Sequence, residues 1–256
     1  MVTARMGIYL LALSPLHVGG DEGRFGYEET IVVRRTYRNY VPYVPGSTVK
    51  GVLRTAACYV AKLVGATCCW AKEPTEIVDR HSKMGMPCDV CRIWGYPGHR
   101  GMLSVTDFVL VDGIPTTMLR LTHIEIDDYT GRAKEGALYV MDYVPAGTLF
   151  RGMLELEMER PVDLTLVLSS MYILEYVGMG RGGIVRAYLE SLEFRDIGKK
   201  KLEVKDENDL RKALTQAYGS VSEVELTVKL YRELHLPPEP ELDLLKELSA
   251  PRVWRW

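Results

Sequence analysis

Apolar and polar residues alternate in several short stretches of the chain, and each of these stretches predicts a β-strand. The first is Met6–Leu13, which ends at the turn signal Ser14-Pro15. Residues 116–148 predict a long hairpin that turns near Thr130-Gly131. The other strand-like stretches are residues 31–33, 40–44, 101–113, 148–159 and 184–194.

Other segments have apolar residues at helical spacing. Residues 49–65 predict a helix that begins after an N-cap at Ser47 or Thr48 and ends at Gly65. Residues 163–177 predict a second helix, and the charged residues 199–216 are also typical of one. The order strand, helix, strand occurs twice, which indicates an α+β fold built from one or two βαββαβ units.

The composition is that of a soluble folded protein. Charged residues make up 26% and hydrophobic residues 47% of the 256 residues, and the net charge is −2. This balance excludes a polycation that binds nucleic acid over its whole surface. We find no apolar run long enough to cross a membrane, and the first apolar run alternates like a strand and not like a signal peptide. We therefore expect a cytoplasmic protein.

The amide residues are very few, namely Asn39, Asn208 and Gln216. Depletion of thermolabile Asn and Gln is reported for hyperthermophile proteins, so we interpret the source as a thermophile. Intracellular disulfides do occur in such organisms. The cysteines must therefore be interpreted from their spacing.

Residues 66–100 are rich in Cys, Pro, Gly and charge, and they predict an inserted small lobe with a structural zinc site. Cys88-x-x-Cys91 is typical of a zinc knuckle, with His81 and Cys69 as the other ligands and Cys68 as the alternative to Cys69. Four protein ligands leave no open position for hydrolysis. A disulfide or plain thiols are the alternative. Cys58 lies on the predicted apolar helix and is expected in the core.

Residues 44–54, VPGSTVKGVLR, predict a phosphate-binding helix start. Ser47 and Thr48 lie where backbone N–H groups are free, and Lys50 and Arg54 follow on one helix face. Residues 31–60 contain five basic residues and no acidic one, which makes a local basic patch. The alternative is an ordinary capped helix with solvated charges.

Residues 178–186, GMGRGGIVR, predict a second contact with phosphate. Gly180 and Gly182 would let the backbone approach a ligand, and Arg181 and Arg186 add cations. The spacing matches neither a dinucleotide fingerprint nor a P-loop. A purely structural hairpin is the alternative.

The chain resembles the RAMP superfamily. The resemblance rests on the motifs at 44–54 and 178–186, together with LHVGG at 16–20, TGRAKEGALY at 130–139 and VPAGTLF after it. The resemblance spans about residues 6–195 in order. Within the family the chain is most similar to the backbone subunits of type III (Csm/Cmr-like) CRISPR effector complexes.

The resemblance implies a ferredoxin-like (RRM-like) palm over residues 1–196, with insertions at about 66–100 and 117–145 and an extension at 197–256. The insertion at 66–100 would be the zinc lobe, and that at 117–145 a thumb hairpin that wedges into the duplex of guide and target RNA. The implied partners are guide RNA, target RNA, other RAMP subunits and the large subunit. The implied RNA-binding residues are His17, Arg34, Ser47, Thr48, Lys50, Arg54, His123, Gly180, Arg181, Gly182 and Arg186.

Catalysis is where the chain departs from the family. Slicing subunits carry an Asp where this chain has Glu29, and Asp21 lies earlier in the loop. One alternative is therefore an endoribonuclease that uses these acids with a divalent metal such as magnesium, or His17 as acid or base. Another is a protein-binding scaffold that caps the complex through its acidic, Pro-rich tail.

Overall fold

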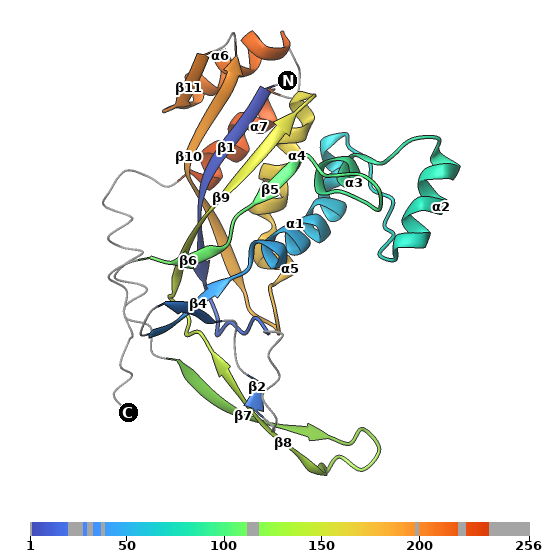
Figure 1. Ribbon diagram of the computed structural model, residues 1–256, viewed down its shortest axis with the longest axis vertical. Helices are drawn as coiled ribbons and strands as arrows, with labels where there is room; N and C mark the ends of the chain where they lie inside the picture. Colours follow the sequence, from blue (N-terminus) through green and yellow to red (C-terminus); the bar gives the residue numbers. More distant parts are fainter. Residues whose placement is uncertain are drawn as a thin grey trace.

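The computed structural model describes residues 2–19, 28–29, 33–36, 39–111, 118–197, 200–219 and 224–235. These ranges form a mixed α/β structure in which mainly antiparallel strands are covered by helices (Figure 1). The strands are β1 (Val2–Ala12), β2 (Glu28–Glu29), β3 (Val33–Thr36), β4 (Asn39–Val44), β5 (Leu103–Val105), β6 (Phe108–Leu110), β7 (Leu119–Ile126), β8 (Ala133–Tyr143), β9 (Leu149–Met158), β10 (Val185–Ile197) and β11 (Lys200–Val204). The helices are α1 (Gly46–Val60), α2 (Pro74–Met84), α3 (Asp89–Trp94), α4 (Pro161–Tyr172), α5 (Leu174–Val177), α6 (Glu207–Tyr218) and α7 (Val224–Leu234), and a 3₁₀ turn, η1, covers Ala61–Val64.

The large sheet has the strand order β11-β10-β1-β9-β6-β4-β3, and β5 also pairs with β9. Each of these pairs is antiparallel. The long strands β1, β9 and β10 form its centre, and β7 and β8 form a hairpin that extends from one end of the molecule (Figure 1). The short strand β2 pairs with β8.

One face of the large sheet forms the core, as the alternation of β9 illustrates. Phe150, Leu154 and Leu156 are buried, whereas Arg151 and Glu155 between them are exposed. Helices α1, α4 and α7 lie against the buried face (Figure 1). Helix α4 is buried almost throughout because it contacts α1, α7 and strands β9 and β10. Among the described residues, no helix combines the length and the apolar character needed to cross a membrane.

The start of α1 differs from the prediction. The helix begins at Gly46 with Pro45 as its N-cap residue, and neither Ser47 nor Thr48 caps it. The carboxylate of Asp107 accepts a 2.9 Å hydrogen bond from the backbone N–H of Gly46. This acid comes from the chain after β5, so a tertiary contact takes the place of the local cap.

The charged segment 199–216 was wrongly predicted as one helix. Its first part is strand β11, which pairs with the edge of β10 between Leu192↔Val204 and Ile197↔Lys200. Helix α6 begins only after Asp206, whose side chain accepts the N–H of Asp209 at 2.8 Å. Pairing with an available sheet edge overrides the helical preference of the Lys- and Glu-rich sequence.

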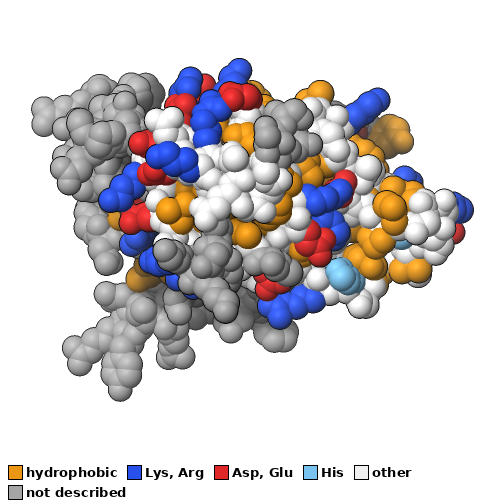
Figure 2. Space-filling model, turned by 90° about the horizontal axis from the view of Figure 1, so that it is seen from above, with side chains coloured by type: hydrophobic (Ala, Val, Ile, Leu, Met, Phe, Trp, Pro, Cys, Tyr) orange, Lys and Arg blue, Asp and Glu red, His pale blue; other side chains and the backbone are white. Residues whose placement is uncertain are grey.

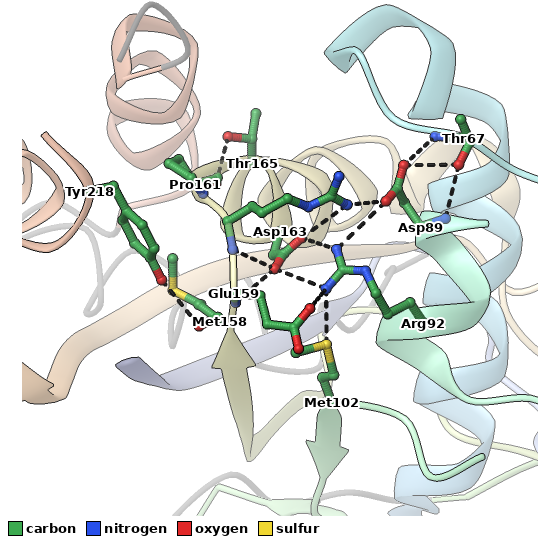
Figure 3. A network of polar contacts seen from close by, with 11 residues as sticks. Thr67, Asp89, Arg92, Met102, Met158, Glu159, Pro161, Asp163, Thr165 and Tyr218 are labelled. Carbon is green, nitrogen blue, oxygen red and sulfur yellow. Dashed lines mark hydrogen bonds and ion pairs between the residues drawn. The ribbon is translucent and has the colours of Figure 1, made fainter. Parts of the chain in front are cut away.

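Residues 66–100, which we call the lobe, contain α2 and α3 and lie beside the helical layer (Figure 1). An ion-pair network joins the lobe to α4 (Figure 3). Arg92 of α3 pairs with the fully buried carboxylate of Asp163 and with Glu159 at 3.0 Å. Asp163 also accepts the backbone N–H groups of Glu159 and Arg160, each at 3.0 Å. The first turn of α4 therefore holds the lobe through one buried charge.

A second carboxylate completes this network. Asp89, the first residue of α3, accepts hydrogen bonds from the backbone N–H and the hydroxyl of Thr67, and it pairs with Arg160 (Figure 3). Burial opposes its ionisation, but the hydrogen bonds from Arg160 and Thr67 outweigh burial and lower the pKa of Asp89. Asp89 therefore stays ionised and connects the beginning of the lobe to the beginning of α4.

Substitution Arg92→Met is expected to destabilise the protein by about 3–5 kcal/mol, because it removes the nearest cation from the buried Asp163 carboxylate and leaves only Arg160, at 3.8 Å. The control is Lys83→Met, since Lys83 pairs with Asp79 at 2.7 Å on the exposed surface of α2. Exposed pairs contribute about 0–1 kcal/mol. Denaturant unfolding measures both values, and equal losses would contradict the role given to Arg92.

Candidate functional site

The side chains of Cys69, His81, Cys88 and Cys91 converge in the lobe. Their ligand atoms all lie within 4.8 Å of one another, and all four residues are buried. His81 lies in the last turn of α2, Cys88 is the N-cap residue of α3, and Cys91 lies within α3. Gly85, with φ 74°, ends α2 in a left-handed conformation and allows the chain to return to the cluster.

The two cysteines of the knuckle are held by local hydrogen bonds. The backbone N–H of Cys91 donates to the sulfur of Cys88 at 3.4 Å, and the sulfurs of Cys69 and Cys91 are 3.6 Å apart. A hydrogen bond from the Cys91 thiol lowers the pKa of Cys88 well below its usual range, against the effect of burial. The same bond and burial raise the pKa of Cys91. The pair therefore favours a thiolate, which is the form that binds a metal ion.

Two arginines from outside the ligand set orient the cluster. Arg54 of α1 donates to the sulfur of Cys91 at 3.1 Å and to the carbonyl of Gly95 at 3.1 Å. Arg80 of α2 donates to the carbonyl of Cys69 at 2.7 Å. Neither arginine was predicted for this role. Arg54 could not be, because only the fold brings α1 beside α3.

These residues fit a metal ion. Both ring nitrogens of the buried His81 lack a hydrogen-bond partner among the described residues, which is rare for a buried polar group unless it binds something else. Three thiolates and one imidazole would give a divalent ion a net charge of −1, and the guanidinium of Arg54 offsets that charge. The cluster can thus hold a metal with four protein ligands, which is the arrangement of structural sites.

Cys58 is partly buried and packs against the core, and it forms a disulfide with Cys68. The bond joins α1 to the lobe one residue before the ligand Cys69. It also removes Cys68 as the alternative ligand. The sequence does not decide which of the two cysteines is the ligand, because Cys68 and Cys69 differ by only one residue in their spacing to His81.

Lys50 and Arg54, which were predicted to bind phosphate, both make hydrogen bonds within the protein. The ammonium of Lys50 donates to the carbonyl of Leu103 at 2.7 Å. Burial, with the nearby Arg100 and Arg54, lowers its pKa. Arg54 is engaged by the metal-ligand cluster. In this motif Ser47 is exposed and Thr48 is partly exposed, so only these two hydroxyls lie at the surface of the helix start.

The glycine-rich turn lies against the segment around His17. Gly180 has φ 62°, and a Cβ atom there would come within 2.0 Å of the carbonyl oxygen of His17. The backbone N–H of Arg181 donates to that same oxygen at 3.1 Å. The close approach that Gly180 permits is therefore to the protein's own chain. Arg181 and Gly182 are exposed beside it, and Arg186 pairs with Glu175 at 2.7 Å.

His17 is fully buried, so the prediction that it contacts RNA or acts as an acid or base is wrong. Its Nδ1 atom is 2.9 Å from the carbonyl oxygen of Asp142, and its ring contacts Tyr143. His123, on the hairpin, hydrogen-bonds through Nε2 with the hydroxyl of Tyr143 at 3.0 Å. The two histidines thus fix the base of the hairpin through one tyrosine.

Three predicted residues lie where side chains are not described. Asp21 lies outside the described residues. The backbone of Glu29 and Arg34 is described, but their side chains are not. The backbone of β2 places Glu29 opposite Met141 on β8, and β3 places Arg34 opposite Val41 on β4. The cleavage hypothesis therefore stays a prediction.

A family model described as the RAMP superfamily matches residues 9–185 of the chain. No curated protein matches the chain. The matched range begins within β1 and ends at the first residue of β10, so it includes the end of β1, all of β9, α1, α4, the lobe and the hairpin.

Elemental analysis of protein purified without added metal is expected to give one metal ion per chain, and Cys88→Ser with Cys91→Ser is expected to abolish it. Substitution Arg54→Ala should weaken metal binding about 10–100-fold, because it removes the cation beside the Cys91 sulfur. Competition with a chelator measures this affinity.

Lys50→Ala is the matched control, since Lys50 lies one turn earlier on the same helix and donates to a backbone carbonyl outside the cluster. Its metal affinity should equal that of the unaltered protein. A metal-free preparation, or equal losses in both variants, would contradict the assignment.

Proposed function

The chain belongs to the RAMP superfamily, and because members of this family bind RNA and act in multi-subunit CRISPR complexes, we propose that it is a guide-RNA-binding backbone subunit of a type III complex. In this role it would contact target RNA, other RAMP subunits and the large subunit in the cytoplasm. The role requires contacts that do not depend on the guide sequence, and contacts with phosphate meet that requirement.

The observation that carries the proposal is the hairpin of β7 and β8. Every residue of β7 is at least partly exposed, and Ile124 and Ile126 are 54% and 56% exposed. Leu138 on β8 is also exposed. Apolar side chains on a projecting hairpin suit insertion between base steps, where unstacked bases cover them. We therefore propose that this hairpin is the thumb that wedges into the duplex of guide and target.

The tip of this hairpin is built to keep its shape. The carboxylate of Asp127 accepts the backbone N–H groups of Tyr129 and Thr130 at 3.0 and 2.8 Å. These bonds lower the pKa of Asp127, so the carboxylate remains an acceptor at neutral pH. Tyr129 at the tip is fully exposed. A preorganised tip supports insertion, because little conformational entropy is lost on binding.

We propose that β1, α1, β5 with β6, β9, α4 and β10 form a ferredoxin-like palm. Their order along the chain is βαββαβ when β5 and β6 count as one strand. Their order in the sheet, β10-β1-β9-β6, places the first and third strands at the centre. The lobe and the hairpin are then insertions in this unit, and α6 and α7 belong to the extension.

For the metal site we propose structural zinc. Three cysteines and one histidine in a closed, buried set suit zinc better than magnesium or calcium, which prefer oxygen ligands. When bound, the ion would hold the segment before α2 to α3 and so maintain the lobe. We do not extend the proposal to cleavage of RNA.

Purification of the tagged full-length protein from its native host tests the role directly. We expect guide RNAs that contain CRISPR repeat sequence, together with other RAMP subunits and the large subunit. Sequencing and mass spectrometry identify both. Recovery of the partner proteins with this chain at an end of the complex and without contact to RNA would favour the capping-scaffold alternative.

Phosphate contacts are expected at the exposed Arg181 and not at Lys50. Arg181→Ala should weaken the binding of single-stranded RNA to the full-length protein and reduce the salt slope of log affinity by about 1. Lys50→Ala should leave both unchanged, because its ammonium is bound to the Leu103 carbonyl. Fluorescence anisotropy at several salt concentrations measures these quantities, and the reverse pattern would contradict the proposed interface.

A further inference from the structure

A pocket of about 380 Å³ lies where the last turns of α1 meet the first residues of the lobe. None of the residues that line it belongs to the hairpin or to the glycine-rich turn. Figure 2 shows hydrophobic side chains gathered over the lobe at the right of the view, whereas charged side chains of both signs are interspersed elsewhere. The pocket is lined by Arg54, Thr55, Cys58, Tyr59, Trp70 and Lys72 among others.

Two aromatic side chains in this pocket face solvent. Tyr59 is 59% and Trp70 is 54% exposed, and their ring centroids are 5.3 Å apart with an interplanar angle of 72°. An edge-to-face pair covers only one face of one ring, so ring faces remain for a third flat group. Exposed aromatics of this kind are typical of surfaces on which unpaired bases stack.

The backbone holds Trp70 in an unusual conformation. Its φ is 57°, and it is the only residue other than glycine with a positive φ among the described residues. The N–H of Trp70 donates to the sulfur of Cys68 at 3.3 Å, and Cys68 is tied to α1 by its disulfide with Cys58. Cys69, directly before Trp70, belongs to the metal-ligand cluster. The disulfide and the buried cysteine cluster thus flank a residue in a sparsely populated conformation, which is a pattern found at ligand-binding positions.

The charge of the pocket favours an anion. Arg54 and Lys72 line it, and none of the lining residues is acidic. Residues 31–72 contain seven basic residues and no Asp or Glu. Arg54 is engaged by Cys91 and Gly95, so it contributes positive potential, while the exposed Lys72 can contact a phosphate.

Flat aromatic faces next to a cation, in a space of this size, suit a nucleotide. We propose that the pocket binds an unpaired base of single-stranded RNA by stacking on Trp70 and Tyr59, with Lys72 on an adjacent phosphate. This inference rests on the proposed RNA-binding function and adds a contact on the lobe. An acidic protein segment is the competing occupant, but the exposed ring faces favour a base over a carboxylate side chain.

Binding of a short labelled oligouridine to the full-length protein tests the proposal. Trp70→Ala and Tyr59→Ala should each weaken affinity roughly 5- to 150-fold, the range for loss of one stacked base. Trp70→Phe should restore most of it, because a ring remains. Leu63→Ala is the matched control, since Leu63 is 81% exposed next to the same helix and does not line the pocket.

Lys72→Ala should reduce the salt slope by about 1, and Lys62→Ala, which removes the same charge outside the pocket, should change it less.

Oligouridine that contains 5-iodouridine should cross-link under ultraviolet light to the peptides of Tyr59 or Trp70. Tyr59 lies on the exposed side of α1, so its variant is expected to retain the fold and the metal even where a change at Trp70 disturbs the lobe.

The outcomes separate the two proposals. If the unaltered protein binds RNA and both aromatic variants bind equally well without cross-links, the pocket assignment is overturned and the RNA-binding function stands. If the unaltered protein binds no RNA, both fail. If the aromatic variants keep their RNA affinity but lose a partner subunit, the pocket is a protein-docking surface, which also overturns the assignment.

Discussion

The buried carboxylate of Asp163 constrains much of this structure. A charge that is fully removed from solvent is stable only with a cation and hydrogen-bond donors around it, and here the cation is Arg92, one residue after the ligand Cys91. The same carboxylate accepts the N–H groups of Glu159 and Arg160, the two residues directly before α4, a helix that is buried almost throughout. The core of the α/β unit and the metal lobe thus share one electrostatic centre, and neither can shift without exposing or unpairing it.

Helix α1 provides the second attachment of the lobe, through one stripe of side chains. Lys50, Arg54 and Cys58 follow each other at intervals of one turn, and each reaches the lobe or the strand after it. Lys50 donates to the carbonyl of Leu103, Arg54 donates to the sulfur of Cys91, and Cys58 forms the disulfide with Cys68, so the three contacts are chemically different. The basic spacing that indicates a phosphate site in the sequence therefore lies on the face by which α1 holds the lobe.

Sequence reasoning works here where the determining contacts are local. The alternation of residues 148–159 predicts β9, and the spacing of His81, Cys88 and Cys91 predicts ligands that the structure brings together, because a knuckle turn and an adjacent helix fix their geometry. It fails where a residue far away in the sequence determines the local structure. Asp107 caps α1 from a position 61 residues away, β10 converts the start of a predicted helix into β11, and Leu103 takes the ammonium of Lys50. None of these partners has a signal in the neighbouring sequence.

The near-neutral net charge of −2 does not mean that every part of the fold is neutral. Many arginines are neutralised within the fold, as in the pairs Arg151–Glu190, Arg211–Glu225 and Arg232–Glu207. Residues 31–72 contain no acid, and two of their cations, Lys50 and Arg54, donate to a carbonyl and to a sulfur. Lys62 and Lys72 are exposed, and Lys72 lines the same pocket as the two aromatic rings. Positive potential is therefore concentrated by the absence of acids in one segment, and a chain that is acidic overall can still present a local surface for RNA.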